Sequence, residues 1–233
     1  EATPGSVFFL ESPKTIGGKY EHTFKKYFWS MSGPVFFIST VWGEEKSQQG
    51  DLDAMVKKSS KLQERFNKNP SDYETLKELG VIYHDMALKD AKTYAKKAVN
   101  SLEEVQKIKP EDNVTLCFLG SAYTLMAKES WNPVSKSNYV NKGIEGMDKA
   151  VKKDPDNITV RMTRGLNSRG LPGFLNRRQV ACEDFEHLAD LFEKGFKVPA
   201  SLKSTVYKNL SELYKEDGDK VKAQKYKVMA ENL

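Results

Sequence analysis

Arginine is concentrated in one short stretch of this chain, and its side chain is suited to binding anions. Five of the six arginines fall within 18 residues, whereas the 31 lysines are spread along the chain. A planar guanidinium binds carboxylates and phosphates through several hydrogen bonds at once. The stretch therefore predicts either a network of internal ion pairs or a site for an anion or acidic peptide. The five residues are Arg161, Arg164, Arg169, Arg177 and Arg178.

The spacing of these arginines assigns them to two groups. Arg161 and Arg164 share one helical face, and we expect them to pair with acidic side chains inside the fold. Their candidate partners are Asp148, Asp184 and Glu186. The other three flank a loop that Gly170 and the Pro172-Gly173 pair predict over residues 171–176. We expect those three to face solvent and to be the ligand candidates: Arg169, Arg177 and Arg178.

Residues for catalysis or metal binding are few and scattered. The three histidines, His22, His84 and His187, lack the paired spacing of metal ligands. Cys117 and Cys182 lie 65 residues apart, which excludes a paired-cysteine zinc site and a disulfide scaffold. Cys117 could act as a nucleophile, but buried thiols in helices are common. The sequence therefore predicts no enzyme, no metal site and no cofactor.

The composition limits the class of protein that positions these side chains. The 233 residues carry a formal net charge of +5, with 39% hydrophobic and 30% charged residues. These values exclude a polytopic membrane protein and a mostly disordered chain, and the length suits one domain, or a tail plus one domain. Acidic residues are interleaved with the basic ones, and no nucleic-acid-binding motif is present. Nucleic acid is therefore an unlikely partner.

The first 43 residues differ from the rest of the chain. Residues 1–24 show no periodicity, and we expect them to be disordered or not native. Lys25 and Lys26 precede 17 uncharged residues, 27–43. This order is typical of a secretory signal peptide cut near Glu44, which predicts an exported protein, periplasmic or secreted. The segment could instead be an uncleaved membrane anchor, although a span needs about 20 residues, or an apolar segment packed on a cytoplasmic domain.

Prolines mark a repeat along the remainder of the chain. Their spacings are 40, 45 and 44 residues, and such periods predict stacked supersecondary units. The four prolines are Pro70, Pro110, Pro155 and Pro199. Matching residues follow the first two at equal offsets: Leu76, Leu79, Gly80 and Tyr83, then Leu116, Leu119, Gly120 and Tyr123. A helical glycine costs about 1 kcal/mol relative to alanine, so its repetition predicts that a neighbouring helix approaches closely.

These residues resemble the tetratricopeptide repeat (TPR) family, through Leu-Gly-x-x-Tyr in the first helix and Asp-Pro-x-Asn at the exit. The resemblance covers roughly residues 51–233. It implies an all-α fold, a right-handed array of helical hairpins forming a TPR-like α-solenoid. The expected repeats span residues 71–110, 111–155, 156–198 and 200–233. Leu52–Phe66 is expected to be an orphan second helix or a packing helix. The family period is 34 residues, and the clearest insertion here is Trp131-Asn132-Pro133-Val134.

The TPR resemblance implies a non-enzymatic scaffold that binds a protein or peptide in a groove lined by the first helices. By register with the family, the groove candidates are Lys77, His84 and Thr124, with Cys117 and Ser121 beside them. Lys77 occupies a carboxylate-clamp position of the family, but Val81 stands where asparagine is needed. The alternative is a solute- or anion-binding accessory subunit that uses the arginine-rich third repeat. Residues 221–230 are expected to expose an apolar stripe that supports a weak homodimer.

Overall fold

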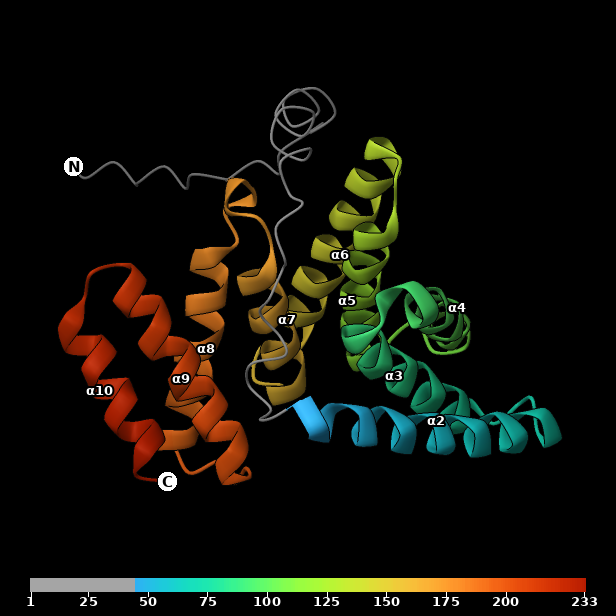
Figure 1. Cartoon of the computed structure of the whole chain (residues 1–233), viewed down its shortest axis with the longest axis horizontal. Coiled ribbons are helices and arrows are strands. Elements are labelled where there is room, and N and C mark those ends of the chain that lie inside the picture. Colours follow the sequence, from blue (N-terminus) through green and yellow to red (C-terminus); the bar gives the residue numbers. More distant parts are fainter. Residues whose placement is uncertain (1–44) are drawn as a thin grey trace, which may run out of the picture. The chain divides into compact units, whose positions relative to one another are not determined.

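The computed structural model describes residues 45–233, and within this range it contains helices, turns and loops but no strand (Figure 1). The all-α class expected from the repeats is confirmed. The α-helices are α2 (Glu45–Lys68), α3 (Tyr73–Lys89), α4 (Ala91–Ile108), α5 (Asn113–Glu129), α6 (Pro133–Lys153), α7 (Ile158–Gly170), α8 (Arg178–Glu193), α9 (Ala200–Glu216) and α10 (Lys220–Glu231), and a short 3₁₀ turn, η3, spans Gly173–Leu175.

The helices begin where the sequence places capping residues after the repeat prolines. The Asp72 carboxylate accepts a hydrogen bond from the Thr75 backbone N–H, and Asp112 does the same for Thr115. Asn157 caps α7 through the N–H of Val160. Such caps satisfy backbone donors that have no partner within the helix. The polar residues after the first three prolines therefore fix where α3, α5 and α7 start, whereas α9 follows Pro199 directly and has no side-chain cap.

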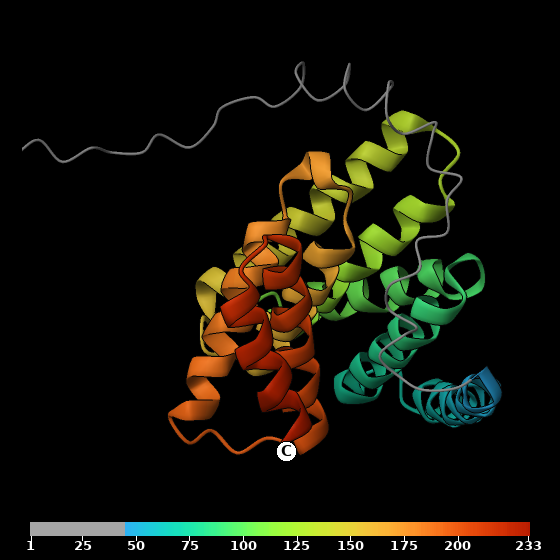
Figure 2. The same ribbon diagram turned by 60° about the vertical axis from the view of Figure 1, so that its left-hand side comes forward.

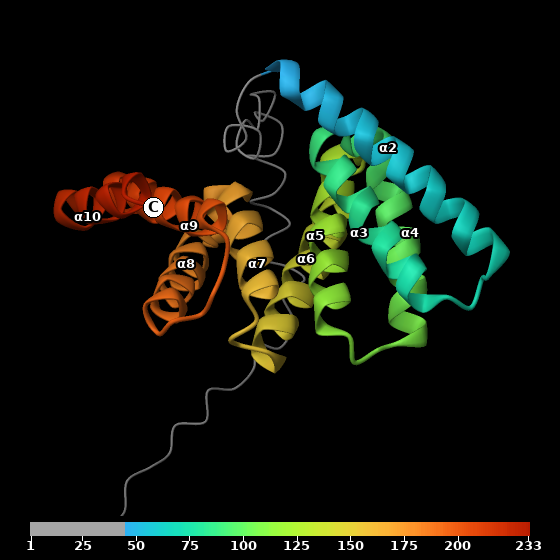
Figure 3. The same cartoon turned by 90° about the horizontal axis from the view of Figure 1, so that it is seen from below.

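Consecutive helices pair into antiparallel hairpins, α3–α4, α5–α6, α7–α8 and α9–α10 (Figures 1 and 2). Each of the first three hairpins also contacts the hairpin that follows it, through α4 with α5, α6 with α7, and α8 with α9. The helix α2 belongs to no hairpin, and it packs against α3, as Figure 3 shows from below. The right-handed TPR-like array is thus confirmed.

The repeated glycines lie where helices meet most closely. A Cβ atom at Gly80 would stand 2.7 Å from Leu102 Cδ2, a buried side chain of α4. A Cβ atom at Gly120 would stand 2.7 Å from the backbone oxygen of Gly143 in α6. Both separations are shorter than ordinary van der Waals contact. The close approach predicted from the sequence is confirmed.

The C-terminal helix covers most of its apolar side against the core. Tyr226, Met229 and Ala230 of α10 pack on the cluster formed by α8 and α9. Val221 is 82% exposed and Val228 is exposed as well. The expected apolar stripe is therefore narrower than the sequence suggests, and self-association through it remains a prediction.

No helix among the described residues combines the length and apolarity that a membrane span requires. The predicted signal or anchor, residues 25–43, and the segment 1–24 lie outside the described residues.

Candidate functional site

Two of the expected groove residues lie inside the fold and join its first helices. His84 of α3 and Thr124 of α5 are buried. His84 Nε2 lies 2.8 Å from the Ser121 hydroxyl, and Asn167 of α7 donates its amide to Thr124 Oγ1 at 2.7 Å and to Ser121 Oγ at 3.2 Å. This chain of hydrogen bonds connects α3, α5 and α7. A buried polar network of this kind fixes how helices pack.

Asp85 extends this network, so that a carboxylate, an imidazole and a hydroxyl lie next to one another in space. Asp85 Oδ1 lies 3.2 Å from His84 Nδ1, and the opposite ring nitrogen faces Ser121. Ser121 is buried in the middle of α5, where backbone N–H groups are engaged in the helix. A nucleophilic serine needs access and free donors for an oxyanion. The geometry therefore supports packing rather than acyl transfer.

Lys77 is held by an ion pair at the start of the next repeat. Its Nζ donates to Asp112 Oδ2 at 2.6 Å, and the Tyr73 hydroxyl donates to the same oxygen at 2.5 Å. Burial opposes ionisation of Asp112, but hydrogen bonds from Lys77, Thr115 and Tyr73 outweigh it and lower its pKa to about 2. The ion pair thus stabilises the junction between the first two repeats.

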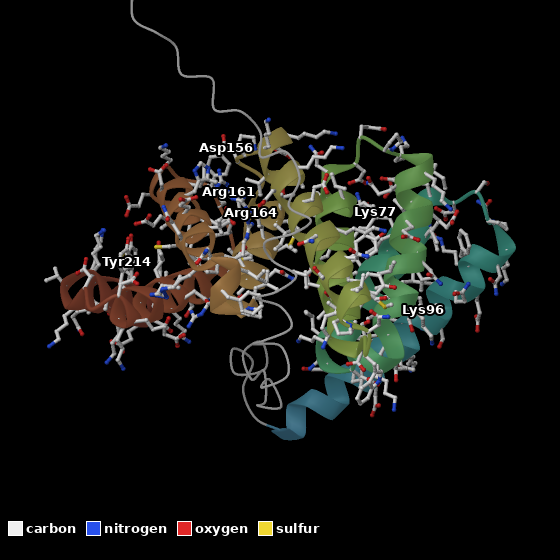
Figure 4. The ribbon with its side chains drawn as sticks, turned by 90° about the horizontal axis from the view of Figure 1, so that it is seen from above. Lys77, Lys96, Asp156, Arg161, Arg164 and Tyr214 are labelled. Atoms are coloured by element: carbon white, nitrogen blue, oxygen red, sulfur yellow. The ribbon has the colours of Figure 1, made fainter. Side chains whose placement is uncertain are left out.

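Arg161 and Arg164 surround one carboxylate, as expected. Asp184 of α8 has 0% of its side chain exposed, and it accepts hydrogen bonds from Arg161 Nη1 at 2.9 Å and from Arg164 Nη2 at 2.7 Å. Arg164 also reaches Asp148 of α6 at 3.1 Å. Figure 4 shows the two arginines together, apart from Lys77 on α3. Glu186, the third expected partner, instead accepts a hydrogen bond from Tyr214.

The prediction that the other three arginines face solvent is wrong for two of them. Arg177 is 12% exposed and holds both oxygens of Asp148, at 2.6 and 2.9 Å. Arg169 is 13% exposed because it reaches across to α9, where it donates to Asn209 Oδ1 and to Glu212. Arg178, 37% exposed, pairs with exposed carboxylates at the end of α9. An anion would have to displace these carboxylates.

Cys117 is packed rather than reactive. Its thiol is buried and lies 3.5 Å from the carbonyl oxygen of Val160. Burial raises its pKa to about 12. The thiolate, which is the nucleophilic form, is therefore scarce at neutral pH. Neither Cys117 nor any group of three or more His, Cys, Asp or Glu side chains within residues 45–233 is arranged for a metal ion.

A cleft of about 320 Å³ opens between α2 and the first hairpin. Its α3–α4 wall contains the stacked rings of Tyr83 and Tyr94, 6.5 Å apart, and the thioether of Met86. Lys97 Nζ lies over both rings, at 5.7 and 5.3 Å from their centroids. The α2 wall is mainly polar and contributes Val56, Ser59, Ser60, Gln63, Glu64 and Asn67.

Comparison with known proteins gives a family match and a structural match. Residues 53–170 match the family described as the plant-specific mitochondrial import receptor subunit TOM20. This chain belongs to that family. The TOM20-family match runs from α2 to the end of α7 and includes every residue that lines the cleft.

The second match confirms the fold of the TOM20-family chain. A thermophilic TPR protein of Thermus thermophilus superposes with a TM-score of 0.59 at 17% identity, over 79% of this chain and 85% of that one. Comparison with curated proteins gives no match. The TPR fold and the receptor family together indicate a protein-binding scaffold with protein partners.

Sequence reasoning missed the cleft in this TOM20-family chain. One signal was present in α2: Ser60, Gln63 and Asn67 recur at helical spacing with polar side chains, whereas the neighbouring stripe of the helix, which packs on α3, carries Met55 and Leu62. A helix that only packs would carry larger apolar residues on a broad face. No such signal marks Tyr94 and Lys97, because their place in the cleft depends on how α2 packs on α3.

Proposed function

We propose that the cleft between α2 and the α3–α4 hairpin binds a helical segment of a protein destined for mitochondria. The observation that supports this most is the position of an aromatic-walled cleft wholly within the residues that match an import-receptor family. Mitochondrial transit peptides are amphipathic, rich in arginine and serine, and poor in acidic residues. An amphipathic helix is recognised by inserting its apolar anchors into a groove.

The dimensions and chemistry of the cleft fit such a ligand. A volume of about 320 Å³ is at the small end for ligand pockets, so it suits one or two apolar side chains rather than a whole helix. Tyr83, Tyr94 and Val56 offer apolar surface to these anchors. Glu64 and Gln63 on the α2 wall can accept hydrogen bonds from basic or hydroxyl side chains on the rim of the bound helix.

Peptide binding tests this function directly. Fluorescence anisotropy would follow a labelled amphipathic peptide of leucine, arginine and serine, with a scrambled peptide of the same composition as the reference. Val56→Lys removes an apolar contact and places a positive charge against the basic peptide from a partly exposed site, and we expect about tenfold weaker binding. Val221→Lys, on the exposed face of α10, is the matched control and should bind normally. Equal affinity for both peptides, or no effect of Val56→Lys, would refute the cleft.

The cellular location follows as a second part of the proposal. An import receptor acts at mitochondria, and residues 27–43 then serve as a retained anchor rather than a cleaved signal. Fractionation of cells that express the tagged chain, with and without residues 25–43, tests this. We expect the chain to sediment with mitochondria and its N-terminal segment to remain uncut. A secreted product beginning near Glu44 would instead support the export prediction.

A further inference from the structure

The turn between α5 and α6 carries the most exposed aromatic side chain of the described residues. Trp131 is 100% exposed, and Val134, three residues later, is 57% exposed. Pro133 between them is exposed too. Only a few residues earlier, Leu125 of α5 is buried against the α3–α4 hairpin. Apolar side chains of the α5–α6 hairpin thus lie both in the buried core and at its solvent-exposed turn.

This turn is held in one conformation by its own hydrogen bonds. Asn132 caps α6 by accepting from the backbone N–H groups of Val134 at 2.9 Å and Ser135 at 3.2 Å. Pro133 occupies the first turn of α6, where its fixed φ suits the helix start. The close contact of Gly120 with Gly143 ties the two helices together behind the turn. The backbone that carries Trp131 is therefore ordered at the start of α6, so the turn need not be rebuilt when the indole binds.

A bilayer surface fits this turn better than a protein partner does. The turn is a convex end with three exposed apolar residues, whereas a stable protein interface needs about 800 Å² on each side. Tryptophan is favoured at the boundary between lipid and water, where one part of the ring is apolar and its N–H stays hydrated. Lys128 and Lys136 flank the turn, with Glu129 beside them. The positive charges of the two lysines complement anionic headgroups.

A second hairpin end lies toward the same side of the molecule. Figures 1 and 2 show the α7–α8 turn and the α5–α6 turn at the same ends of their hairpins. The α7–α8 turn contains Leu171, Pro172 and Phe174, all partly exposed. Two apolar turns on one side would give a membrane contact a defined orientation.

We propose that the α5–α6 turn is a membrane-interface anchor that inserts the indole of Trp131 among the headgroups of an anionic bilayer. This inference is independent of the peptide cleft, which lies between α2 and the first hairpin. A failure to bind peptide would refute the cleft but not the membrane anchor, and a failure to bind vesicles would refute the membrane anchor but not the cleft.

The first experiment isolates the fluorescence of Trp131. The chain contains three tryptophans, so Trp29→Phe combined with Trp42→Phe leaves Trp131 as the sole indole emitter, whatever other segment touches lipid. Vesicles of phosphatidylcholine and phosphatidylglycerol (7:3) should shift its emission to shorter wavelength, and brominated acyl chains should quench it. Emission that stays unchanged on addition of vesicles would overturn the proposal and favour a protein partner.

The second experiment measures, by vesicle flotation, the partitioning of the chain without residues 25–43, so that the segment proposed as an anchor does not hold every variant on the vesicles. Trp131→Ala should lower the partition coefficient about tenfold, because it removes the largest apolar surface of the turn. Ile108→Ala truncates an exposed side chain at the end of α4, and this matched control should partition like the wild type. Pure phosphatidylcholine vesicles or high salt should weaken binding, since the lysines lose their attraction. Equal losses for Trp131→Ala and Ile108→Ala would overturn the proposal.

Discussion

The α3–α4 and α5–α6 hairpins close around tyrosines, whereas the α7–α8 hairpin closes around a buried aspartate. In the first two, Tyr83 stacks on Tyr94 and Tyr123 stacks on Tyr139, with Lys97 and Lys142 over the rings. In the third, the position equivalent to Tyr83 is Ser168, and its buried hydroxyl has no partner among the described residues.

All three hairpins keep the glycine that lets the helices approach. A Cβ atom at Gly165 would stand 3.1 Å from the Phe185 ring and 3.2 Å from Asp184 Cβ. The surroundings of the glycine differ: they are apolar side chains and backbone in the first two hairpins, and the Phe185 ring together with the buried, charged Asp184 in the third. Breaking a buried ion pair is costly because it leaves a charge without compensation, whereas stacked rings at a surface lose only contact area. The third repeat is therefore the one whose stability depends on single side chains.

The largest expected effect comes from removing the shared carboxylate. Asp184→Ala leaves Arg161 and Arg164 facing each other in a buried site, and it should lower the free energy of unfolding by about 3–5 kcal/mol. Burial opposes the charge of Arg164, and Asp184 and Asp148 more than compensate by raising its pKa. Urea denaturation would measure the loss. Asp148→Ala, at a partly exposed carboxylate, should cost less, and equal costs would contradict a special role for Asp184.

A smaller loss is expected at the glycine contact between α5 and α6. Gly120→Ala would place its Cβ against the backbone of Gly143 and 3.0 Å from Met147, so the helices must move apart. We expect a net loss of about 2 kcal/mol, since overpacking outweighs the gain in helix propensity. Gly170→Ala, where no atom lies within 4 Å, is the matched control. A Gly120→Ala protein as stable as the Gly170→Ala protein would show that the close approach is not required.

The junction between the first two repeats gives a pH-dependent effect. The pKa of Asp112 is lowered to about 2 in the fold, so its contribution is present above its ordinary pKa near 4 and is lost as pH falls toward 2. Asp112→Asn keeps a capping side chain but removes the charge. We expect it to be about 1–2 kcal/mol less stable than the wild type at pH 7.

The difference between these two proteins should shrink between pH 4 and pH 2, since the wild-type carboxylate then becomes protonated. Thermal unfolding of both proteins across this range would measure this difference. The contributions of the other carboxylates to stability cancel in the comparison, because they titrate in both proteins. A difference that stays constant with pH would show that the Lys77–Asp112 ion pair contributes little.

The sequence predicted those features that depend on spacing within one helix or between repeats. The glycine contacts, the capping residues after the first three prolines, and the pairing of Arg161 and Arg164 all follow from periodicity or from the absence of an apolar residue at a packing position. The pattern could not predict how deeply a side chain lies once another repeat covers it. Arg169 flanks a predicted loop, yet α9 covers it because Asn209 lies opposite. His84 was expected in a groove, but it is buried against α5, where it contacts Ser121 and the Phe118 ring.

The smallest expected loss of stability is at Arg178, and it is best measured against its neighbour Arg177. Arg177 is enclosed and grips Asp148 through two hydrogen bonds, whereas Arg178 pairs with the exposed carboxylates of Glu216 and Asp217. Arg178→Ala should therefore cost only about 0–1 kcal/mol, as exposed ion pairs do. Its cost should also fall further in high salt, because salt screens exposed charges. Arg177→Ala should cost at least twice as much, with little dependence on salt. Urea denaturation of both variants at low and high salt would measure this, and equal costs would mean that neighbouring arginines on this turn act as one exposed charge cluster rather than as one buried and one surface contact.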